Sequence, residues 1–284
     1  MGLVYWNGFQ YTLLSMAENK RGELMKKAVF FDIDNTIWNA KNEIPASTVT
    51  AIRGIRANGH LAFLCSGRTR SFIRHPDLLG IGFDGIVSGC GTCVEYGGET
   101  VFYKKLDADL VEHTVLTVRK YGFRPILEGR KYLYLDMEEF EDDFYGRKLI
   151  NDMGEDLRSI KGEWGRWEVS KLSCATESPD RLKCFDELSV YYDYMIHNDA
   201  VAEFVPKGFT KASGMEKVCE ILGMDMTDTI AFGDSENDRA MILAAGTGVV
   251  MGNGAPAIKE IADLVARPMM EDGIYHACLS LGLL

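Results

Sequence analysis

The sequence predicts an α/β protein with a parallel sheet, into which a second, α+β domain is inserted. Short apolar runs alternate with helical patterns up to about residue 85 and again from about residue 204. Strands that alternate with helices in this way are typical of a parallel sheet. The stretch between them mixes hairpins with helices. A chain of 284 residues is long enough for two cores of ordinary size.

We therefore expect a parallel-sheet domain at residues 25–85 and 204–284, and an inserted α+β domain at residues 86–203. Residues 1–24 are interpreted as an N-terminal extension. This stretch has no basic start, and no apolar run in it is long enough to span a bilayer. Met25 lies just before the first strand, so we expect a natural start there.

The first buried strand is predicted at residues 28–31, and two carboxylates, Asp32 and Asp34, follow it. Ligands of a parallel sheet bind at the carboxyl ends of its strands. Side chains two apart on an extended segment point to the same side, and two carboxylates this close repel each other unless a cation lies between them. An ordinary turn rich in Asp, Asn and Thr is the alternative, and residues 32–36 alone leave both open.

The second buried strand is predicted at residues 61–65, after a helix that Pro45 opens and Gly59 ends. Ser66 and Gly67 follow this strand, and we expect a helix to start there. Backbone N–H groups at such a helix start bind anions, although an ordinary helix cap explains the same residues. A third strand is expected at residues 85–88.

The inserted stretch is predicted to combine a hairpin at residues 94–102 with several helices and strands. The further elements are expected as helices after Asp107, near 139–153 and at 179–188, and as strands at 123–127, 132–135, 167–172 and 190–196. The acidic run at residues 138–143 is interpreted as a solvated helix face.

The alternation of strands and helices resumes after residue 204. Lys211 precedes a predicted helix, and a buried strand at residues 229–232 ends at a polar cluster that includes Asp234 and Asp238. Another strand is expected at residues 249–251, followed by a helix from Pro256.

The composition limits the partners of the protein. A formal net charge of −11 argues against nucleic acid and anionic membranes, which need a basic surface. Seven cysteines, an odd number, predict free thiols and a reducing, cytoplasmic location. Cys90 and Cys93 have the spacing of a zinc pair, but no second pair follows at a suitable distance.

Three predicted strands therefore end in polar clusters, and the carboxyl ends of parallel strands share one edge of the sheet. Carboxylates at Asp32 and Asp234 suit Mg²⁺, which takes a few carboxylates and keeps water or phosphate oxygens as its other ligands. Lys211 adds a fixed positive charge. Phosphoryl transfer requires this combination of nucleophile, metal and donors.

In order and spacing, residues 32–36, 66–68, 211 and 233–238 resemble the four motifs of the haloacid dehalogenase (HAD) superfamily. The large insert and the segment 207–211 resemble its Cof-type sugar-phosphatase branch. The resemblance implies a Rossmann-like core with an α+β cap. It also implies Mg²⁺-dependent hydrolysis of a phosphomonoester through an aspartyl-phosphate, with a sugar phosphate or similar small metabolite as substrate.

The resemblance also implies the roles of individual residues. Asp32 is the implied nucleophile, and Asp34 the implied acid toward the leaving alcohol and base toward water. The implied metal ligands are Asp32, the backbone carbonyl of Asp34, and Asp234, with Ser235 and Asp238 around them. The implied phosphate and substrate contacts are Thr36, which supports its loop, Ser66, Gly67, Lys211 and Asn237.

The chain departs from the family pattern at two places. Asn35 stands where Gly is common, a position that Asn tolerates because it visits left-handed conformations. The turn at residues 90–92, which we expect to face the substrate, lacks the usual Asn-Gly-Ala and leaves the substrate open. Arg68 is expected to touch phosphate or, preferably, to begin its helix.

Aromatic residues of the insert are candidates for a substrate cleft or, more commonly, for a core. They are Trp164, Trp167, Tyr191, Tyr192 and Tyr194. The alternatives to a phosphatase are a phosphomutase, a signalling domain that accepts phosphate on Asp32, and a metal-dependent binding protein.

Overall fold

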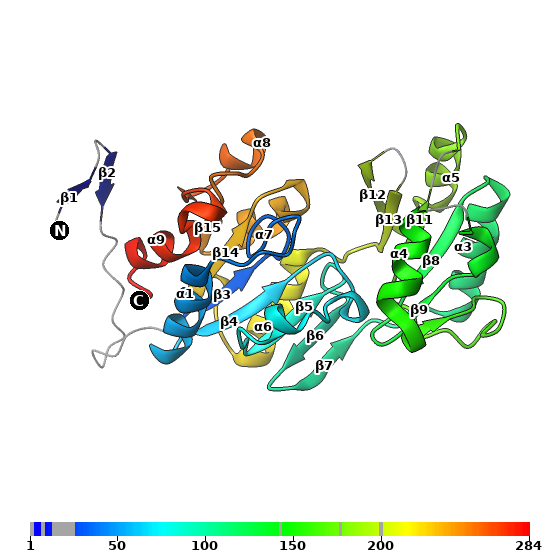
Figure 1. Cartoon of the computed structure of the whole chain (residues 1–284), viewed down its shortest axis with the longest axis horizontal. Helices are drawn as coiled ribbons and strands as arrows, with labels where there is room; N and C mark the ends of the chain where they lie inside the picture. Colours follow the sequence, from blue (N-terminus) through cyan, green and yellow to red (C-terminus); the bar gives the residue numbers. More distant parts are fainter. Residues whose placement is uncertain (1–2, 7–8, 13–25, 142–143, 176–177, 199–200) are drawn as a thin grey trace.

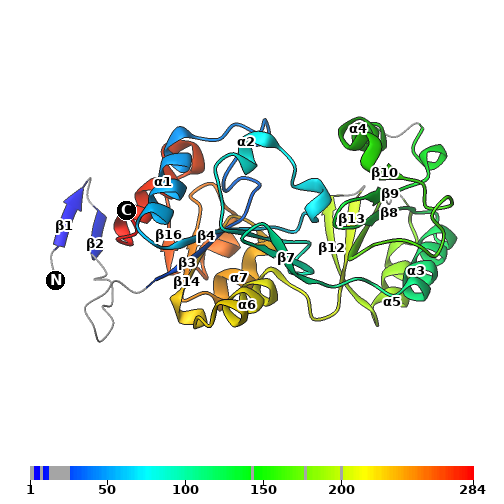
Figure 2. The ribbon, with the colours of Figure 1, turned by 90° about the horizontal axis from the view of Figure 1, so that it is seen from below.

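The computed structural model describes residues 3–6, 9–12, 26–141, 144–175, 178–198 and 201–284. Two sheets with their helices form the two halves of the molecule (Figures 1 and 2). Strands β1 (Leu3–Trp6) and β2 (Phe9–Thr12) form a separate antiparallel pair. The rest of the expected extension lies outside the described residues, and its interpretation as an added arm stays a prediction. No helix within the described ranges is long and apolar enough to cross a membrane.

The first sheet has eight strands in the order β16-β15-β14-β3-β4-β5-β6-β7. Six of them pair in parallel, and β6 and β7 add an antiparallel hairpin at one edge. The strands are β3 (Ala28–Phe31), β4 (Leu61–Cys65), β5 (Gly85–Ser88), β6 (Cys93–Tyr96), β7 (Glu99–Tyr103), β14 (Thr229–Gly233), β15 (Thr247–Val250) and β16 (Leu264–Val265).

Helices cover both faces of this sheet (Figure 2), and its central strands are therefore apolar on both sides. Alternate residues of β3 show this, because Phe31 packs in the core beneath α1 and α9, whereas Phe30 packs in the core beneath α6 and α7. The helices are α1 (Ala46–Ala57), α9 (Gly273–Ser280), α6 (Lys211–Leu222) and α7 (Arg239–Ala244), and two short ones are α2 (Pro76–Leu79) and α8 (Pro256–Lys259).

The second sheet has six strands in the order β10-β9-β8-β11-β13-β12. Its pairs are antiparallel except for β9 with β10. Helices α3 and α5 lie on one face and α4 on the other (Figure 2). The elements are β8 (Arg124–Glu128), β9 (Leu133–Tyr134), β10 (Leu157–Arg158), β11 (Lys171–Ala175), β12 (Tyr192–Asn198), β13 (Val201–Pro206), α3 (Ala108–Lys120), α4 (Phe144–Met153) and α5 (Arg181–Leu188).

The predicted fold class, a parallel α/β core with an inserted α+β part, is confirmed. The hairpin predicted at residues 94–102 also forms, but it pairs with β5 of the first sheet. The expected insert at residues 86–203 thus includes two strands of the other sheet. Strand pairing alone does not define a domain boundary, so the division at residues 86 and 203 stays a prediction. All seven cysteines are free and buried.

Several element predictions were wrong in detail. No α-helix starts after Ser66: a single 3-10 turn at Arg70–Phe72 (η1) precedes α2. The described part of the acidic run contributes to a 3-10 turn, and α4 begins only at Phe144. The strand expected at residues 167–172 lies at Lys171–Ala175. Strand β13 was not predicted. It follows its partner β12 so closely in the sequence that the apolar pattern does not separate the two strands.

Candidate active site

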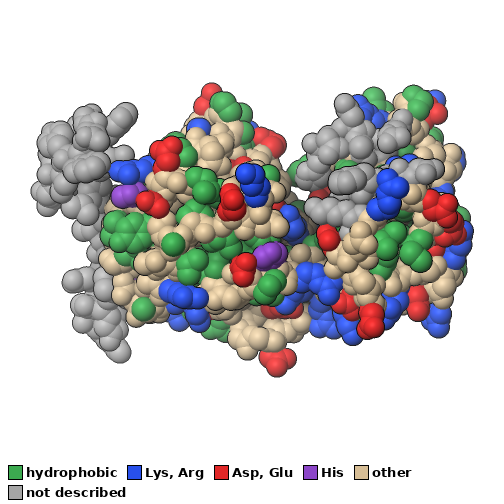
Figure 3. Space-filling model, in the orientation of Figure 1, with side chains coloured by type: hydrophobic (Ala, Val, Ile, Leu, Met, Phe, Trp, Pro, Cys, Tyr) green, Lys and Arg blue, Asp and Glu red, His purple; other side chains and the backbone are tan. Residues whose placement is uncertain are grey.

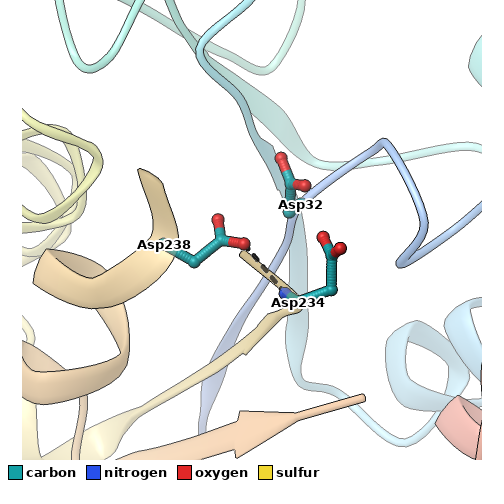
Figure 4. Close-up of side chains that lie close together, drawn as sticks. All are labelled: Asp32, Asp234 and Asp238. Atoms are coloured by element: carbon teal, nitrogen blue, oxygen red, sulfur yellow. Dashed lines mark hydrogen bonds between the residues drawn. The ribbon is translucent and has the colours of Figure 1, made fainter. Parts of the chain in front are cut away.

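The carboxyl ends of β14, β3 and β4, three neighbouring strands, meet at one edge of the first sheet. Asp234 follows β14, Asp32 follows β3 and Ser66 follows β4. Ligand atoms of Asp32, Asp234 and Asp238 all lie within 4.8 Å of one another, and Figure 4 shows the three side chains grouped beyond the strand ends. The predicted convergence of the motifs is therefore present.

Lys211, the first residue of α6, lies at the centre of this group. Thr210 caps the helix, with its side chain accepting from the backbone N–H of Ser213. The Lys211 ammonium donates to Asp32 Oδ1 and Asp238 Oδ1, both at 2.6 Å, and to the side-chain oxygen of Asn237 at 3.3 Å. Burial opposes the charge, but Asp238 and Asp32 raise the pKa of Lys211. It therefore stays a cation.

Asp238 is held by its own loop. Its Oδ2 accepts from the backbone N–H groups of Asp234 at 2.8 Å and Ser235 at 3.0 Å, the first of which is drawn in Figure 4. Gly233 permits this approach, because a Cβ there would lie 2.6 Å from the Asp238 side chain. The Ser235 hydroxyl donates to Asn237 at 3.0 Å. Both oxygens of Asp238 are thus occupied by protein donors.

Asp34 points to a different partner. Arg68 grips its carboxylate with two hydrogen bonds of 2.7 and 2.8 Å, and the Trp38 indole donates a third at 3.0 Å. Burial opposes ionisation, but Arg68 outweighs it and lowers the pKa of Asp34. The preferred interpretation of Arg68 as a helix start was wrong, since Arg68 precedes the 3-10 turn and pairs with Asp34. Asn35 adopts the left-handed conformation with φ of 56°, which confirms why Asn is tolerated there.

The charges of the site favour a divalent cation. The four carboxylates of the site face two fixed cations, Lys211 and Arg68, so with all four carboxylates ionised two negative charges would be unbalanced. Burial and the nearby Asp238 raise the pKa of Asp32 to about 8 and that of Asp234 to about 7. Asp234 Oδ1 is buried and has no hydrogen-bond partner among the described residues. Asp32 and Asp234 therefore fit a hard metal ion.

The loop after β4 supplies the polar groups expected around a phosphoryl group. Ser66 is buried, and its hydroxyl accepts from the backbone N–H of Arg68 at 3.2 Å. Gly67 lines the same cavity. Because no α-helix starts here, the anion site expected at Ser66 and Gly67 has loop N–H groups but no helix dipole. Thr36 is fully buried beneath the loop of Asp32 and Asp34.

A cavity of about 480 Å³ opens between the two halves of the molecule, and Figure 3 shows the notch between them on one face. This volume suits a small metabolite. The residues that line it from the first half include Asp32, Asp34, Ser66, Gly67, Arg68, Asp234, Ser235 and Asn237. The residues that line it from the second half include Glu128, Leu149, Asp152, Lys171, Ser173, Val201 and Glu203.

Sequence reasoning missed the lining of the cavity on the second half. Lys171 and Ser173 are buried polar residues in an otherwise apolar strand. Polar residues at alternate positions of a strand share one face, and this pattern could have indicated the lining. The proposed aromatic residues do not line this cavity. Trp167 and Tyr192 belong to the core of the second half, and Trp164, Tyr191 and Tyr194 are exposed.

The turn at residues 90–92 was expected to face the substrate, and this stays a prediction. Cys90, Gly91 and Thr92 are buried and do not line the cavity described above. Cys90 lines a neighbouring cavity together with Lys211 and Asn237. The Thr92 hydroxyl lies 2.9 Å from the carbonyl oxygen of Gly89 and 3.1 Å from the Ser170 hydroxyl.

Comparison with known proteins agrees with this geometry. A family model described as haloacid dehalogenase-like hydrolase matches residues 29–278. YkrA of Bacillus subtilis, which is named as a phosphatase, is 33% identical over 275 residues, covering 91% of this chain and 98% of YkrA. A phosphoglycolate phosphatase of Methanosarcina acetivorans is 30% identical over 254 residues, covering 88% of this chain and 94% of the relative.

Solved structures share the fold. The sugar phosphatase BT4131, described as a HAD subclass IIB enzyme, superposes with a TM-score of 0.78 at 24% identity. The match covers 91% of this chain and all of that structure. At this level of identity the comparison concerns the fold alone, and it extends over both sheets.

Proposed function

The chain belongs to the haloacid dehalogenase-like hydrolases and is a Cof-type phosphatase, and we propose that it hydrolyses a small phosphomonoester through an aspartyl-phosphate on Asp32. One observation carries the proposal. Asp32 lies at the end of β3, held by the Lys211 ammonium at 2.6 Å, beside an Asp234 oxygen without a hydrogen-bond partner among the described residues. A sugar phosphate is the proposed kind of substrate.

The proposed reaction has two steps. An Asp32 carboxylate oxygen attacks phosphorus, the P–O bond to the leaving alcohol breaks, and an acyl phosphate forms. Water then attacks that phosphorus, the bond between phosphorus and the Asp32 oxygen breaks, and phosphate and the free Asp32 carboxylate are released. Lys211 neutralises charge beside Asp32, and the Gly67 amide, the Ser66 hydroxyl and Asn237 bind the phosphoryl oxygens. Thr36 supports the loop.

Asp34 is proposed as the acid toward the leaving alcohol and the base toward water. In the conformation described here its carboxylate is paired with Arg68, which favours the ionised form. Release from Arg68 therefore has to precede proton donation to a poor leaving group. Asp34 also offers its backbone carbonyl to the metal.

Mg²⁺ is the proposed cofactor, held by Asp32, Asp234 and the carbonyl of Asp34. When bound, it would neutralise charge on the phosphoryl oxygens. Asp238 and Ser235 do not bind the ion in this proposal. They hold the loop that carries Asp234, because Asp238 accepts from the Asp234 and Ser235 amides and pairs with Lys211.

The Asp32→Asn substitution tests the nucleophile. We expect turnover of an aryl phosphate to fall by roughly 10³-fold or more, because the amide cannot attack phosphorus. Asp77→Asn, the same chemical change at an exposed residue outside the cavity, should leave turnover unchanged. Retention of full turnover by a folded Asp32→Asn variant would rule the mechanism out.

Two further measurements separate the alternatives. Mass spectrometry of acid-quenched wild type should find one phosphoryl group on the peptide that contains Asp32. Release of many equivalents of phosphate per enzyme distinguishes a hydrolase from a signalling domain that only accepts phosphate. Absence of isomerised hexose phosphate distinguishes it from a phosphomutase.

A further inference from the structure

The cavity has a second polar wall opposite Asp32, formed by three neighbouring strands of the second sheet. In the strand register Lys171 of β11 lies opposite Glu128 of β8, and Ser173 of β11 lies opposite Glu203 of β13. All four side chains line the cavity. From the other half of the molecule, they face the loop at residues 66–69, which we call the phosphate loop because it is proposed to bind the phosphoryl group. They are therefore placed to meet the leaving group of a bound phosphomonoester.

Lys171, the cation of this wall, is already paired with acceptors of the protein. The Lys171 ammonium donates to Glu203 Oε2 at 2.7 Å and to the carbonyl oxygen of Gly67 at 2.9 Å, and it lies 3.5 Å from Glu128 Oε2. Lys171 is 1% exposed. An ammonium has three N–H donors, and these three partners account for them. Lys171 therefore has no donor left for a ligand.

The carboxylates of the wall lie close to the phosphate loop. A Cβ on Gly67 would lie 3.9 Å from Glu203 Oε2, so Glu203 approaches the loop that is proposed to hold the phosphoryl group. The Thr69 hydroxyl, on the same loop, donates to Glu128 Oε2 at 3.1 Å. A leaving group attached to that phosphoryl group would meet these acceptors first.

The charge of the wall is unfavourable for an anion. Among the described residues that line the cavity, both cations are paired, Lys171 with the glutamates and Arg68 with Asp34. Asp152 adds a further carboxylate to the lining. An ionised carboxylate accepts hydrogen bonds but donates none, and like charges brought together across a binding site disfavour binding.

Resting on the proposed function, we propose that Glu203 and Glu128 select substrates whose leaving group is uncharged and rich in hydroxyl groups, and that they reject leaving groups with a carboxylate or a second phosphate. Burial raises the pKa of Glu128, although Lys171 lowers it. Glu203 is less buried and is therefore the residue to substitute.

One relative of this chain is named for a substrate with the opposite kind of leaving group. The Methanosarcina acetivorans relative is named for phosphoglycolate, whose leaving group carries a carboxylate. The polar wall described above indicates that this chain uses the same reaction on the opposite class of leaving group. Glycerol 3-phosphate and 3-phosphoglycerate test the point directly, because they differ mainly in a terminal hydroxymethyl group or carboxylate.

The experiment compares kcat/KM for these two substrates in the wild type, in Glu203→Gln and in Glu163→Gln. Glu163 is a cap residue outside the cavity lining, so its variant makes the same change in net charge. We expect the wild type to prefer glycerol 3-phosphate about tenfold or more, since removal of one repelling charge near an anion changes affinity by about this factor. Glu203→Gln should reduce the preference, mainly through KM for 3-phosphoglycerate, and Glu163→Gln should keep it.

An aryl phosphate serves as the reference substrate in every variant. If the wild type does not hydrolyse it, the proposed function fails. If the aryl phosphate is hydrolysed, competition by the two glycerol compounds gives inhibition constants even where their own turnover is slow. Equal or preferred binding of 3-phosphoglycerate, or an unchanged preference in Glu203→Gln, overturns the inference and leaves the phosphatase activity standing.

Discussion

At the scale of single residues, the pairing of Asp34 with Arg68 has the largest effect on the proposed mechanism. The two aspartates of the first motif, two positions apart, have opposite surroundings. Burial and Asp238 raise the pKa of Asp32 to about 8, whereas Arg68 outweighs burial and lowers the pKa of Asp34. Without a bound cation, the residue proposed as the acid is thus the more acidic of the two.

The Arg68→Met substitution tests this arrangement. If Asp34 must be protonated to assist an alkyl leaving group, turnover falls as the pH rises above its pKa. Loss of the guanidinium raises that pKa, so the falling limb of kcat for an alkyl phosphate should move to higher pH. An aryl phosphate, whose leaving group needs no proton, serves as the internal control. A falling limb at the same pH in wild type and variant would contradict the role of Arg68.

At the scale of elements, the turn between β5 and β6 packs against the start of α6. Gly91 has φ of 85°. A Cβ there would lie 2.5 Å from the carbonyl oxygen of Thr210 and 2.8 Å from the backbone nitrogen of Gly214. Gly91 therefore lets the turn pack directly against the start of α6, which carries Lys211.

The Gly91→Ala substitution should lower the free energy of unfolding by about 2 kcal/mol or more, because left-handed strain and the close backbone contact add. Urea denaturation measures the change. Gly122→Ala is the matched control, since Gly122 has a similar φ of 80° and nothing within 4 Å of its added Cβ. It should show the strain alone. Equal losses in the two variants would mean that the contact with α6 contributes nothing.

The whole molecule has a net charge of −11, yet its proposed substrate is an anion. The first half places Lys211, Arg68 and loop N–H groups at the strand ends, and the proposed Mg²⁺ would offset the carboxylates that gather there. The second half places carboxylates across the cavity. With the proposed substrate bound, the two halves would therefore offer different chemistry to its two ends, the phosphoryl group on one side and the leaving group on the other.

The proposed Mg²⁺ would offset the negative charge of the site, and thermal unfolding tests whether the ion binds there. Mg²⁺ at constant ionic strength should raise Tm, because a ligand at 100 times its Kd stabilises the folded state by about 2.7 kcal/mol. Asp234→Asn should abolish most of this gain. Asp77→Asn should keep it. An equal rise of Tm in Asp234→Asn and wild type would show that the ion binds elsewhere.

The sequence by itself determined the chemistry at the strand ends. Apolar runs buried on both faces have to be interior strands, and the residues that follow them have to share an edge of the sheet. The convergence of Asp32, Ser66 and Asp234 could therefore be predicted, because residues that follow parallel strands of one sheet lie at the same edge.

Only the tertiary structure decided which groups meet across elements. The Arg68 grip on Asp34, the burial of the turn at residues 90–92 and the wall of Glu128, Lys171 and Glu203 all depend on the register and packing of segments far apart in the chain. No local pattern encodes such distances. A helix start after Ser66 was predicted from residue type, but the structure has only a single 3-10 turn at Arg70–Phe72. The sequence thus indicates the reaction, and the packing of the two halves decides which side chains line the cavity.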